Sequence, residues 1–219
     1  MATVAILPIK NFDGAKQRLG DEIDAGPRRA LAEAMFSDVV VALRRARSVE
    51  RILVVSADPT AQQIAAGHGA SVLEEPDEGH NAAASAGIRA ILQSSEDRAL
   101  LVPGDCPTLT ADDLDRLIRQ PTGPRSALIV PDRHGTGTNA LLLTPPDSLA
   151  PAFGPGSRAR HEANARAAGL EVQTVSAASL ALDVDTMDDL TAVEAALQST
   201  HGGAAHTRGM LRQMSRSRG

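Results

Sequence analysis

Three aspartates are the residues whose chemistry is easiest to interpret in this 219-residue sequence. Asp105 follows the apolar run 99–102 by way of a Pro-Gly pair, and Asp183 and Asp185 alternate in Leu-Asp-Val-Asp-Thr at residues 182–186. Alternate residues of a strand point to the same side, so Asp183 and Asp185 could direct two carboxylates at one point. Carboxylates held at strand ends can place Mg²⁺ against phosphate oxygens. The three aspartates are therefore candidate metal ligands.

Two of these aspartates have a purely structural alternative. Asp105 could bond a backbone amide in a turn between a strand and a helix. Asp185 or Thr186 could N-cap the helix that the sequence predicts directly after them. Asp183 has no such alternative, because it lies inside an apolar run and a buried carboxylate needs a partner.

A basic segment follows the first apolar run, residues 3–7, and contains Lys10, Lys16 and Arg18. Cationic side chains neutralise a triphosphate and its leaving pyrophosphate. The segment is not a Walker loop, since the pattern G-x-x-x-x-G-K-[ST] is missing. An ordinary solvated loop is the alternative. Together with the acids, the segment favours a site for a metal-bound nucleoside triphosphate, with Lys10, Lys16, Arg18 and Asp105 as catalytic candidates.

Two glycine-rich segments have the composition of anion-binding loops. Residues 132–139 read Asp-Arg-His-Gly-Thr-Gly-Thr-Asn, and residues 153–157 read Phe-Gly-Pro-Gly-Ser. Glycines let backbone N–H groups approach an anion, and Ser157 stands at a predicted helix start, where phosphate and carboxylate groups bind well. The alternatives are a hairpin turn and an N-cap. Two such loops suggest a second, phosphorylated substrate beside the nucleotide.

The elements that must position these residues alternate between strands and helices. Predicted strands are residues 3–7, 51–56, 70–73, 99–102, 126–130, 139–143, 170–175 and 182–184. Predicted helices are residues 27–47, 59–66, 81–93, 112–119, 157–168 and 186–198. The alternation predicts a three-layer, nucleotidyltransferase-like (Rossmann-like) α/β fold, with a mostly parallel sheet and helices on both faces. Ligands of such sheets bind beyond the carboxyl ends of strands, where the candidates lie.

Composition narrows the class of protein further. Hydrophobic residues make up 42% of the chain, with three Phe and no Trp or Tyr, so the core must consist of aliphatic side chains. The single Cys106 excludes an internal disulfide framework and is interpreted as a packing residue. No apolar run reaches membrane-spanning length and no signal peptide is apparent, so we expect a cytoplasmic protein without membrane contacts. The net charge of −5 argues against a nucleic-acid partner.

The end of the chain differs in composition from the rest. Residues 199–219 contain four Arg and no acid, so the remainder has 18 basic and 27 acidic residues, a net charge of −9. This Gly-, Ser- and Arg-rich segment is predicted to be a disordered tail. Residues 1–198 are then one domain. A homo-oligomer is compatible with the sequence.

Five segments together resemble the phospholactate/phosphoenolpyruvate guanylyltransferase family of coenzyme F-420 biosynthesis. They are residues 7–10 with 15–19, 104–107, 132–139, 153–157 with His161, and 182–186. The likeness runs from about residue 3 to residue 197. His80 departs from it, because an apolar residue is usual at this position before Asn-Ala.

The resemblance implies a nucleotidyltransferase that condenses GTP with a phosphorylated three-carbon acid and releases pyrophosphate. By the same resemblance Mg²⁺ would be held by Asp105, Asp183 and Asp185, and the acid by Thr138, Gly154 and Ser157. Phosphoenolpyruvate is the first expectation for the acid, because bacterial members tend to use it. 2-Phospho-L-lactate and 3-phospho-D-glycerate share its phosphate and carboxylate and remain alternatives.

Two other classes of protein stay open on the sequence alone. A sugar- or cofactor-directed nucleotidyltransferase would share the acids, but it typically opens with a glycine-rich first loop, which residues 8–10 lack. A non-catalytic nucleotide-binding regulator would bind GTP without releasing pyrophosphate.

Overall fold

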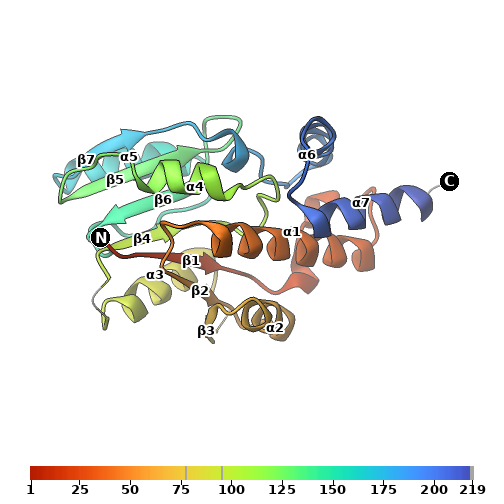
Figure 1. Ribbon diagram of the computed structural model, residues 1–219, viewed down its shortest axis with the longest axis horizontal. Helices are drawn as coiled ribbons and strands as arrows, with labels where there is room; N and C mark the ends of the chain where they lie inside the picture. Colours follow the sequence, from red (N-terminus) through yellow and green to blue (C-terminus); the bar gives the residue numbers. More distant parts are fainter. Residues whose placement is uncertain (77, 95, 218–219) are drawn as a thin grey trace.

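The computed structural model describes residues 1–76, 78–94 and 96–217, and it contains one seven-stranded sheet with helices on both faces (Figure 1). The strands are β1 (Thr3–Pro8), β2 (Arg51–Val55), β3 (Ser71–Leu73), β4 (Arg98–Leu101), β5 (Ser126–Pro131), β6 (Thr138–Thr144) and β7 (Glu171–Thr174). Their order is β3-β2-β1-β4-β6-β5-β7, and β6 is antiparallel to both of its neighbours. The predicted α/β class is confirmed, and β5 and β6 form a hairpin whose turn lies within the first glycine-rich segment.

Strand β1 shows why the central strands are continuous apolar runs. Val4 and Ile6 belong to the core on the face covered by α3 (His80–Ile91) and α5 (Ser157–Ala167), whereas Ala5 and Leu7 face α1 (Ala25–Arg45) and α4 (Ala111–Ile118). A strand covered on both faces has no polar side to show to water. Helix α3 packs closely enough that a Cβ on Gly87 would lie 2.5 Å from Cγ2 of Ile6.

Helix starts follow the local chemistry of the sequence. Asp58 caps α2 (Pro59–Gly67) by accepting hydrogen bonds from the amides of Thr60 at 2.7 Å and Ala61 at 3.0 Å, with a proline at the first helical position. Thr186 caps α6 (Met187–Ser199) in a reciprocal arrangement with Asp189. In the described part of the chain, no helix is long and apolar enough to cross a membrane.

The predicted strand at residues 182–184 is wrong. This segment lies between the 3-10 turn η3 (Ala178–Leu180) and α6 without pairing in the sheet. Single backbone bonds hold it to two loops: Arg133 N donates to Ala181 O at 2.9 Å, and Val184 N donates to Asp105 O at 3.3 Å. A short apolar run was mistaken for a strand because a buried irregular segment has the same composition.

The prediction of a disordered tail also differs from the structure. Residues Ala205–Ser217 form helix α7, which packs along α1 at the end of the molecule opposite the N-terminus (Figure 1). Met210, Leu211 and Met214 pack against a buried cluster that includes Met35 and Val184. Their i, i+1, i+4 spacing is the apolar signal that the Arg-rich composition hid. The last two tail residues, 218–219, lie outside the described residues.

Candidate active site

One cavity of about 900 Å³ opens beyond the carboxyl ends of β1 and β4. All nine residues that the sequence predicts for the site line it. They are Lys10, Lys16, Arg18, Asp105, Thr138, Gly154, Ser157, Asp183 and Asp185. The volume lies in the range of small-molecule sites in proteins. Segments far apart in the sequence therefore converge as expected, although the wall contributed by residues 182–186 is irregular rather than a strand.

One half of the cavity, here called the acidic corner, is made of Lys16, Asp105, Asp183 and Asp185. The Lys16 ammonium bonds Asp105 Oδ2 and lies 3.2 Å from Asp185 Oδ1. Burial works to lower the pKa of Lys16, but the charges of Asp105 and Asp185 outweigh it and raise the pKa above its usual value. Lys16 is therefore charged. Its own backbone is in the left-handed conformation, with φ of 56°.

The ionised form of Asp183 is disfavoured in the acidic corner. Asn139 Nδ2 donates a hydrogen bond to its Oδ1 at 3.0 Å, but burial and then the charge of Asp105 raise its pKa to about 6. Asp105 Oδ1 is buried and has no hydrogen-bond partner among the described residues. The corner therefore contains more negative charge than Lys16 alone neutralises.

The structure confirms Thr186 as the helix cap that the sequence offered as an alternative, and it excludes Asp185 from that role and Asp105 from the bond to a turn amide. Thr186 is the N-cap of α6, which leaves the Asp185 carboxylate free to face the cavity. Thr110 is the N-cap of α4, and Asp105 Oδ2 bonds Lys16 instead of a turn amide. Arg18 Nη1 lies 3.8 Å from Asp185 Oδ2 with its side chain exposed, and Lys10 is exposed on the cavity wall.

The carboxylates have the donor chemistry of a site for a hard divalent cation, but they are not gathered around one point. Within residues 1–76, 78–94 and 96–217, no three His, Cys, Asp or Glu side chains are grouped closely enough to form a metal centre. The Lys16 ammonium sits between Asp105 and Asp185 instead. The donor type is nevertheless the one a hard divalent cation prefers, since Asp105 Oδ1 is a buried carboxylate oxygen without a hydrogen-bond partner among the described residues.

The other half of the cavity, here called the neutral corner, is lined by Thr138, Phe153, Gly154 and Ser157, and His161 is buried directly behind this wall. Gly154 has φ of 116°, a conformation that glycine adopts readily, and Ser157 begins α5. Asn81 clamps the loop from the opposite side: Phe153 N donates to Asn81 Oδ1 at 2.7 Å, and Asn81 Nδ2 donates to Phe153 O at 3.2 Å.

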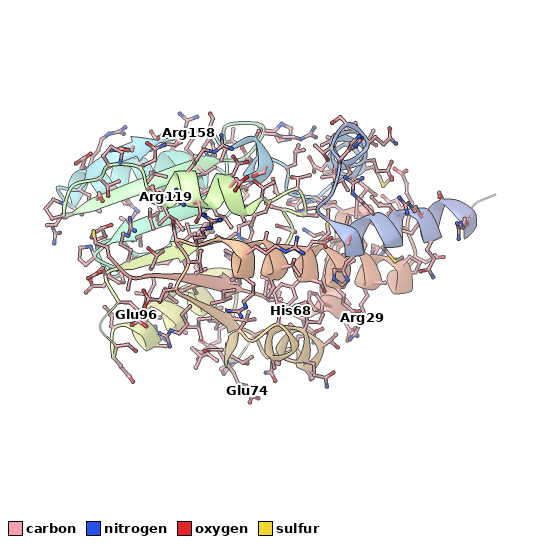
Figure 2. The ribbon with its side chains drawn as sticks, viewed as in Figure 1. Arg29, His68, Glu74, Glu96, Arg119 and Arg158 are labelled. Atoms are coloured by element: carbon pink, nitrogen blue, oxygen red, sulfur yellow. The ribbon has the colours of Figure 1, made fainter. Side chains whose placement is uncertain are left out.

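The two glycine-rich loops are tied to each other by Arg158. Its Nη1 donates to Gly135 O at 3.1 Å, its Nε lies 2.9 Å from Glu162 Oε1, and its backbone N donates to Thr136 O at 3.1 Å. Figure 2 labels Arg158 and, on the opposite side of the molecule, Arg29, which bonds Asp13 and Thr60 and so holds the basic loop against α2.

Sequence reasoning missed the roles of Asn81, Asn139 and buried His161. A polar amide at the start of β6, a strand otherwise rich in leucine, was the available signal for Asn139. Asn81 and His161 act through contacts across 72 and 23 residues, respectively, so their partners could not be read locally, although His161 belongs to a segment that carries the family resemblance. Cys106 is buried, as its interpretation as a packing residue predicts.

Comparison with known proteins settles the family. The family model described as guanylyl transferase CofC like matches residues 3–217. The chain belongs to this family. Phosphoenolpyruvate guanylyltransferase of Conexibacter woesei is 52% identical over 219 residues, covering 99% of this chain and 98% of that protein.

More distant relatives in the same family carry other substrate names. 3-Phospho-D-glycerate guanylyltransferase of Phenylobacterium zucineum is 39% identical, covering 88% of each chain. 2-Phospho-L-lactate guanylyltransferase of Methanothermobacter thermautotrophicus is 33% identical, covering 98% of this chain and 92% of that protein. A putative nucleotide-diphospho-sugar transferase from Desulfovibrio desulfuricans G20 has the same fold, with a TM-score of 0.78, 15% identity, and 99% and 96% of the two chains covered.

Proposed function

We propose that this protein transfers the guanylyl group of GTP to phosphoenolpyruvate, giving enolpyruvoyl-2-diphospho-5′-guanosine and pyrophosphate in coenzyme F-420 biosynthesis. Membership of a guanylyltransferase family supports the reaction class. The observation that carries the proposal is the division of one cavity into a charged corner with Lys16 and three aspartates and a neutral corner with two anion-type loops. Such a cavity can hold a metal-bound triphosphate beside a second anion.

The acidic corner is the proposed metal and triphosphate site. Asp105, Asp183 and Asp185 would hold Mg²⁺, which when bound neutralises phosphate charge and polarises the P–O bonds. Lys16 would stabilise the leaving pyrophosphate, because its ammonium is buried and permanently charged. Lys10 and Arg18 would neutralise the outer phosphates from their exposed positions on the cavity wall.

The chemical step needs little beyond position and charge. A phosphate oxygen of the acid attacks the α-phosphorus of GTP, a new P–O bond forms, and the bond between the α-phosphorus and the bridging oxygen breaks. Pyrophosphate leaves with that electron pair. Since the attacking phosphate is already ionised, no side chain has to remove a proton from it. Catalysis then rests on holding the two anions in line and on neutralising their charge.

The neutral corner is the proposed site of the phosphorylated acid. The Thr138 hydroxyl would donate a hydrogen bond to an anionic oxygen of the acid. Gly154 would bring the backbone close to the substrate, and Ser157 would bind at the N-terminus of α5, where the helix dipole favours negative charge. Phosphoenolpyruvate is preferred over the other two acids because the 52% identical relative carries that name.

A pyrophosphate-release assay with GTP and each of the three acids tests the proposal. We expect the largest kcat/KM with phosphoenolpyruvate, and Asp105→Asn should lower turnover at least about 100-fold while the protein stays folded. Thermal melting of the variant supplies the folding control. Pyrophosphate release with none of the acids would refute the reaction, and near-normal turnover of Asp105→Asn would refute the metal role.

A further inference from the structure

His161 stands directly behind the neutral corner without touching the cavity. It lies on α5, its side chain is fully buried, and it is absent from the cavity lining, whereas Thr138 in front of it lines the cavity. Phe153 packs edge-on against its ring, with centroids 5.0 Å apart. The hydrogen bonds of its two ring nitrogens therefore determine how this buried imidazole acts on the Thr138 hydroxyl, which faces the cavity.

The two hydrogen bonds of the ring decide its tautomer. The backbone amide of Ala152 lies 2.9 Å from Nε2, and Thr138 Oγ1 lies 3.0 Å from Nδ1. A backbone amide can only donate, so Nε2 must accept and carries no proton. In the neutral ring the remaining proton is therefore on Nδ1, which donates to Thr138 Oγ1.

The ring is held in its neutral form by its surroundings. Burial, and then the nearby charge of Arg160, lower the pKa of His161 to about 4. At neutral pH the Nε2 lone pair therefore stays available to the Ala152 amide. The hydrogen-bond geometry and the electrostatics agree on the same state of the ring.

The consequence falls on the Thr138 hydroxyl. A hydroxyl that accepts a bond from Nδ1–H still has its own proton to donate. Among the described residues no group accepts that proton, and Thr138 lines the cavity. The same histidine also binds Ala152, which directly precedes the loop 153–157, so one ring joins both halves of the anion-type wall.

We propose that His161 is a positioning residue that fixes the Thr138 hydroxyl as a hydrogen-bond donor to an anionic oxygen of the phosphorylated acid. The proposal rests on the proposed function, because it takes the acid to occupy the neutral corner. His161 itself does not contact the substrate. The proposal predicts that Thr138 favours an ionised substrate oxygen, which can only accept a hydrogen bond, over a substrate group that has to donate one.

Two substitutions at residue 161 separate the two ring bonds. His161→Asn places an amide nitrogen at the position of Nδ1 and keeps a donor for Thr138. His161→Gln places its amide at the position of Nε2 and keeps an acceptor for Ala152 only. We expect His161→Gln to raise the KM for the acid roughly tenfold and His161→Asn no more than about threefold, with the KM for GTP changed less than about twofold in both. Equal effects of the two variants on the acid KM would overturn the proposal.

A double-mutant cycle with Thr138→Val distinguishes this inference from the function on which it rests. We expect Thr138→Val to raise the acid KM, and His161→Gln to add less than about twofold in that background. If Thr138→Val raises the acid KM but the two changes multiply, the positioning role is wrong and the acid site stands. If Thr138→Val changes the KM of none of the three acids, the acid site itself is wrong, and the inference fails with it.

The wild-type protein offers a readout that does not depend on whether a variant folds. Nitrogen-15 NMR of the histidine rings should show His161 protonated on Nδ1 and unprotonated on Nε2 at pH 7, with a through-bond correlation to the Nδ1 proton. His161→Gln serves to assign the signal by its loss. A ring protonated on Nε2 would overturn the proposal, since that ring could not donate to Thr138.

Discussion

The two corners of the cavity hold their polar groups in opposite ways. In the acidic corner, three carboxylates face one buried ammonium, Asp105 Oδ1 has no partner among the described residues, and the pKa of Asp183 rises to about 6. In the neutral corner, both nitrogens of His161 are bonded and the pKa of the ring falls to about 4, so that it remains uncharged. One corner is short of positive charge, and the other is uncharged, with the Thr138 hydroxyl as a donor that no described residue uses.

The contrast indicates which half of the site should be stabilised more by its ligand. A carboxylate whose ionised form is disfavoured in the free protein gains the most free energy when a cation binds, because the cation removes the unfavourable electrostatic energy and adds contacts of its own. A hydrogen-bond network that is already formed in the free protein gains less and serves instead as a fixed template. We therefore expect the acidic corner to sacrifice stability for function and the neutral corner to contribute to both.

The largest expected effect is that of Asp183→Asn, which should move activity and stability in opposite directions. Turnover should fall at least about 100-fold, since a metal and triphosphate contact is lost. In the presence of EDTA, the free energy of unfolding at pH 7 should rise by up to about 3 kcal/mol, because ionised Asp183 destabilises the folded state. Urea unfolding and pyrophosphate release measure the two quantities. A variant less stable than wild type would show that the acidic corner is not strained.

The second prediction concerns the pH dependence of stability, in which the two corners oppose each other. Asp183 binds a proton more tightly when folded, so its contribution to stability falls as pH rises from 3.8 to about 6. His161 binds a proton more weakly when folded, so its contribution is fully present above pH 6.5 and is lost as pH falls toward about 4. Each contribution amounts to at most about 3 kcal/mol, and they largely cancel between pH 4 and 6.

Replacing either Asp183 or His161 should reveal the pH dependence of stability that the other residue causes. Relative to wild type, Asp183→Asn should gain stability as pH rises from 4 to 6.5, and His161→Gln should lose stability as pH rises over nearly the same interval. Urea titrations at steps of about half a pH unit, in EDTA, give both differences. Parallel curves for wild type and either variant would mean that the pKa of that residue is not shifted in the folded protein.

A smaller effect is expected from the arginine that braces the neutral corner. Arg158→Ala removes the bond to Gly135 O and loosens the turn that carries Thr138, so the acid KM should rise about three- to tenfold. Arg166→Ala is the matched control, because Arg166 also pairs with Glu162, at 3.4 Å, but does not bond the turn. Steady-state kinetics with varied acid at saturating GTP compare them. Similar KM values for the two variants would show that the bond to Gly135 does not position the turn.

The fold could be predicted from the sequence because its signals are local. Apolar runs mark the central strands β1, β2, β4, β5 and β6, and Asp58 with a following proline marks the start of α2. The cavity residues could be named because several follow strands whose carboxyl ends meet at one edge. These signals need no knowledge of distant contacts.

What could not be predicted depends on pairs of residues far apart in the chain. Lys16 bonds Asp105 and Asp185, which lie 89 and 169 positions away from it in the chain. No spacing in the sequence shows that an ammonium lies between these carboxylates. The donor role of Nδ1 in His161 is set by a backbone amide nine residues away. Helix α7 was missed because the Arg-rich composition hid its apolar spacing, and because its first turn bonds Asp38 in α1, which lies 168 and 169 positions away in the chain.

That last contact supplies the smallest predicted effect and a test of how separate the two corners are. Asp38 accepts bonds from the amides of His206 at 3.1 Å and Thr207 at 2.7 Å, so Asp38→Ala should lower the free energy of unfolding by about 1 kcal/mol. Asp24→Ala is the control, since Asp24 precedes α1 but makes no side-chain cap bond, and it should change stability by less than about 0.5 kcal/mol.

Helix α7 covers the core cluster that contains Val184, between two aspartates of the acidic corner, whereas the neutral corner is carried by α5 and the β5–β6 turn. Asp38→Ala should therefore leave the acid KM within about twofold of wild type, and any loss of function should appear in kcat or in the KM for GTP. A rise in the acid KM that matches Arg158→Ala would show that loosening α7 disturbs both corners, and the cavity would then respond as one unit.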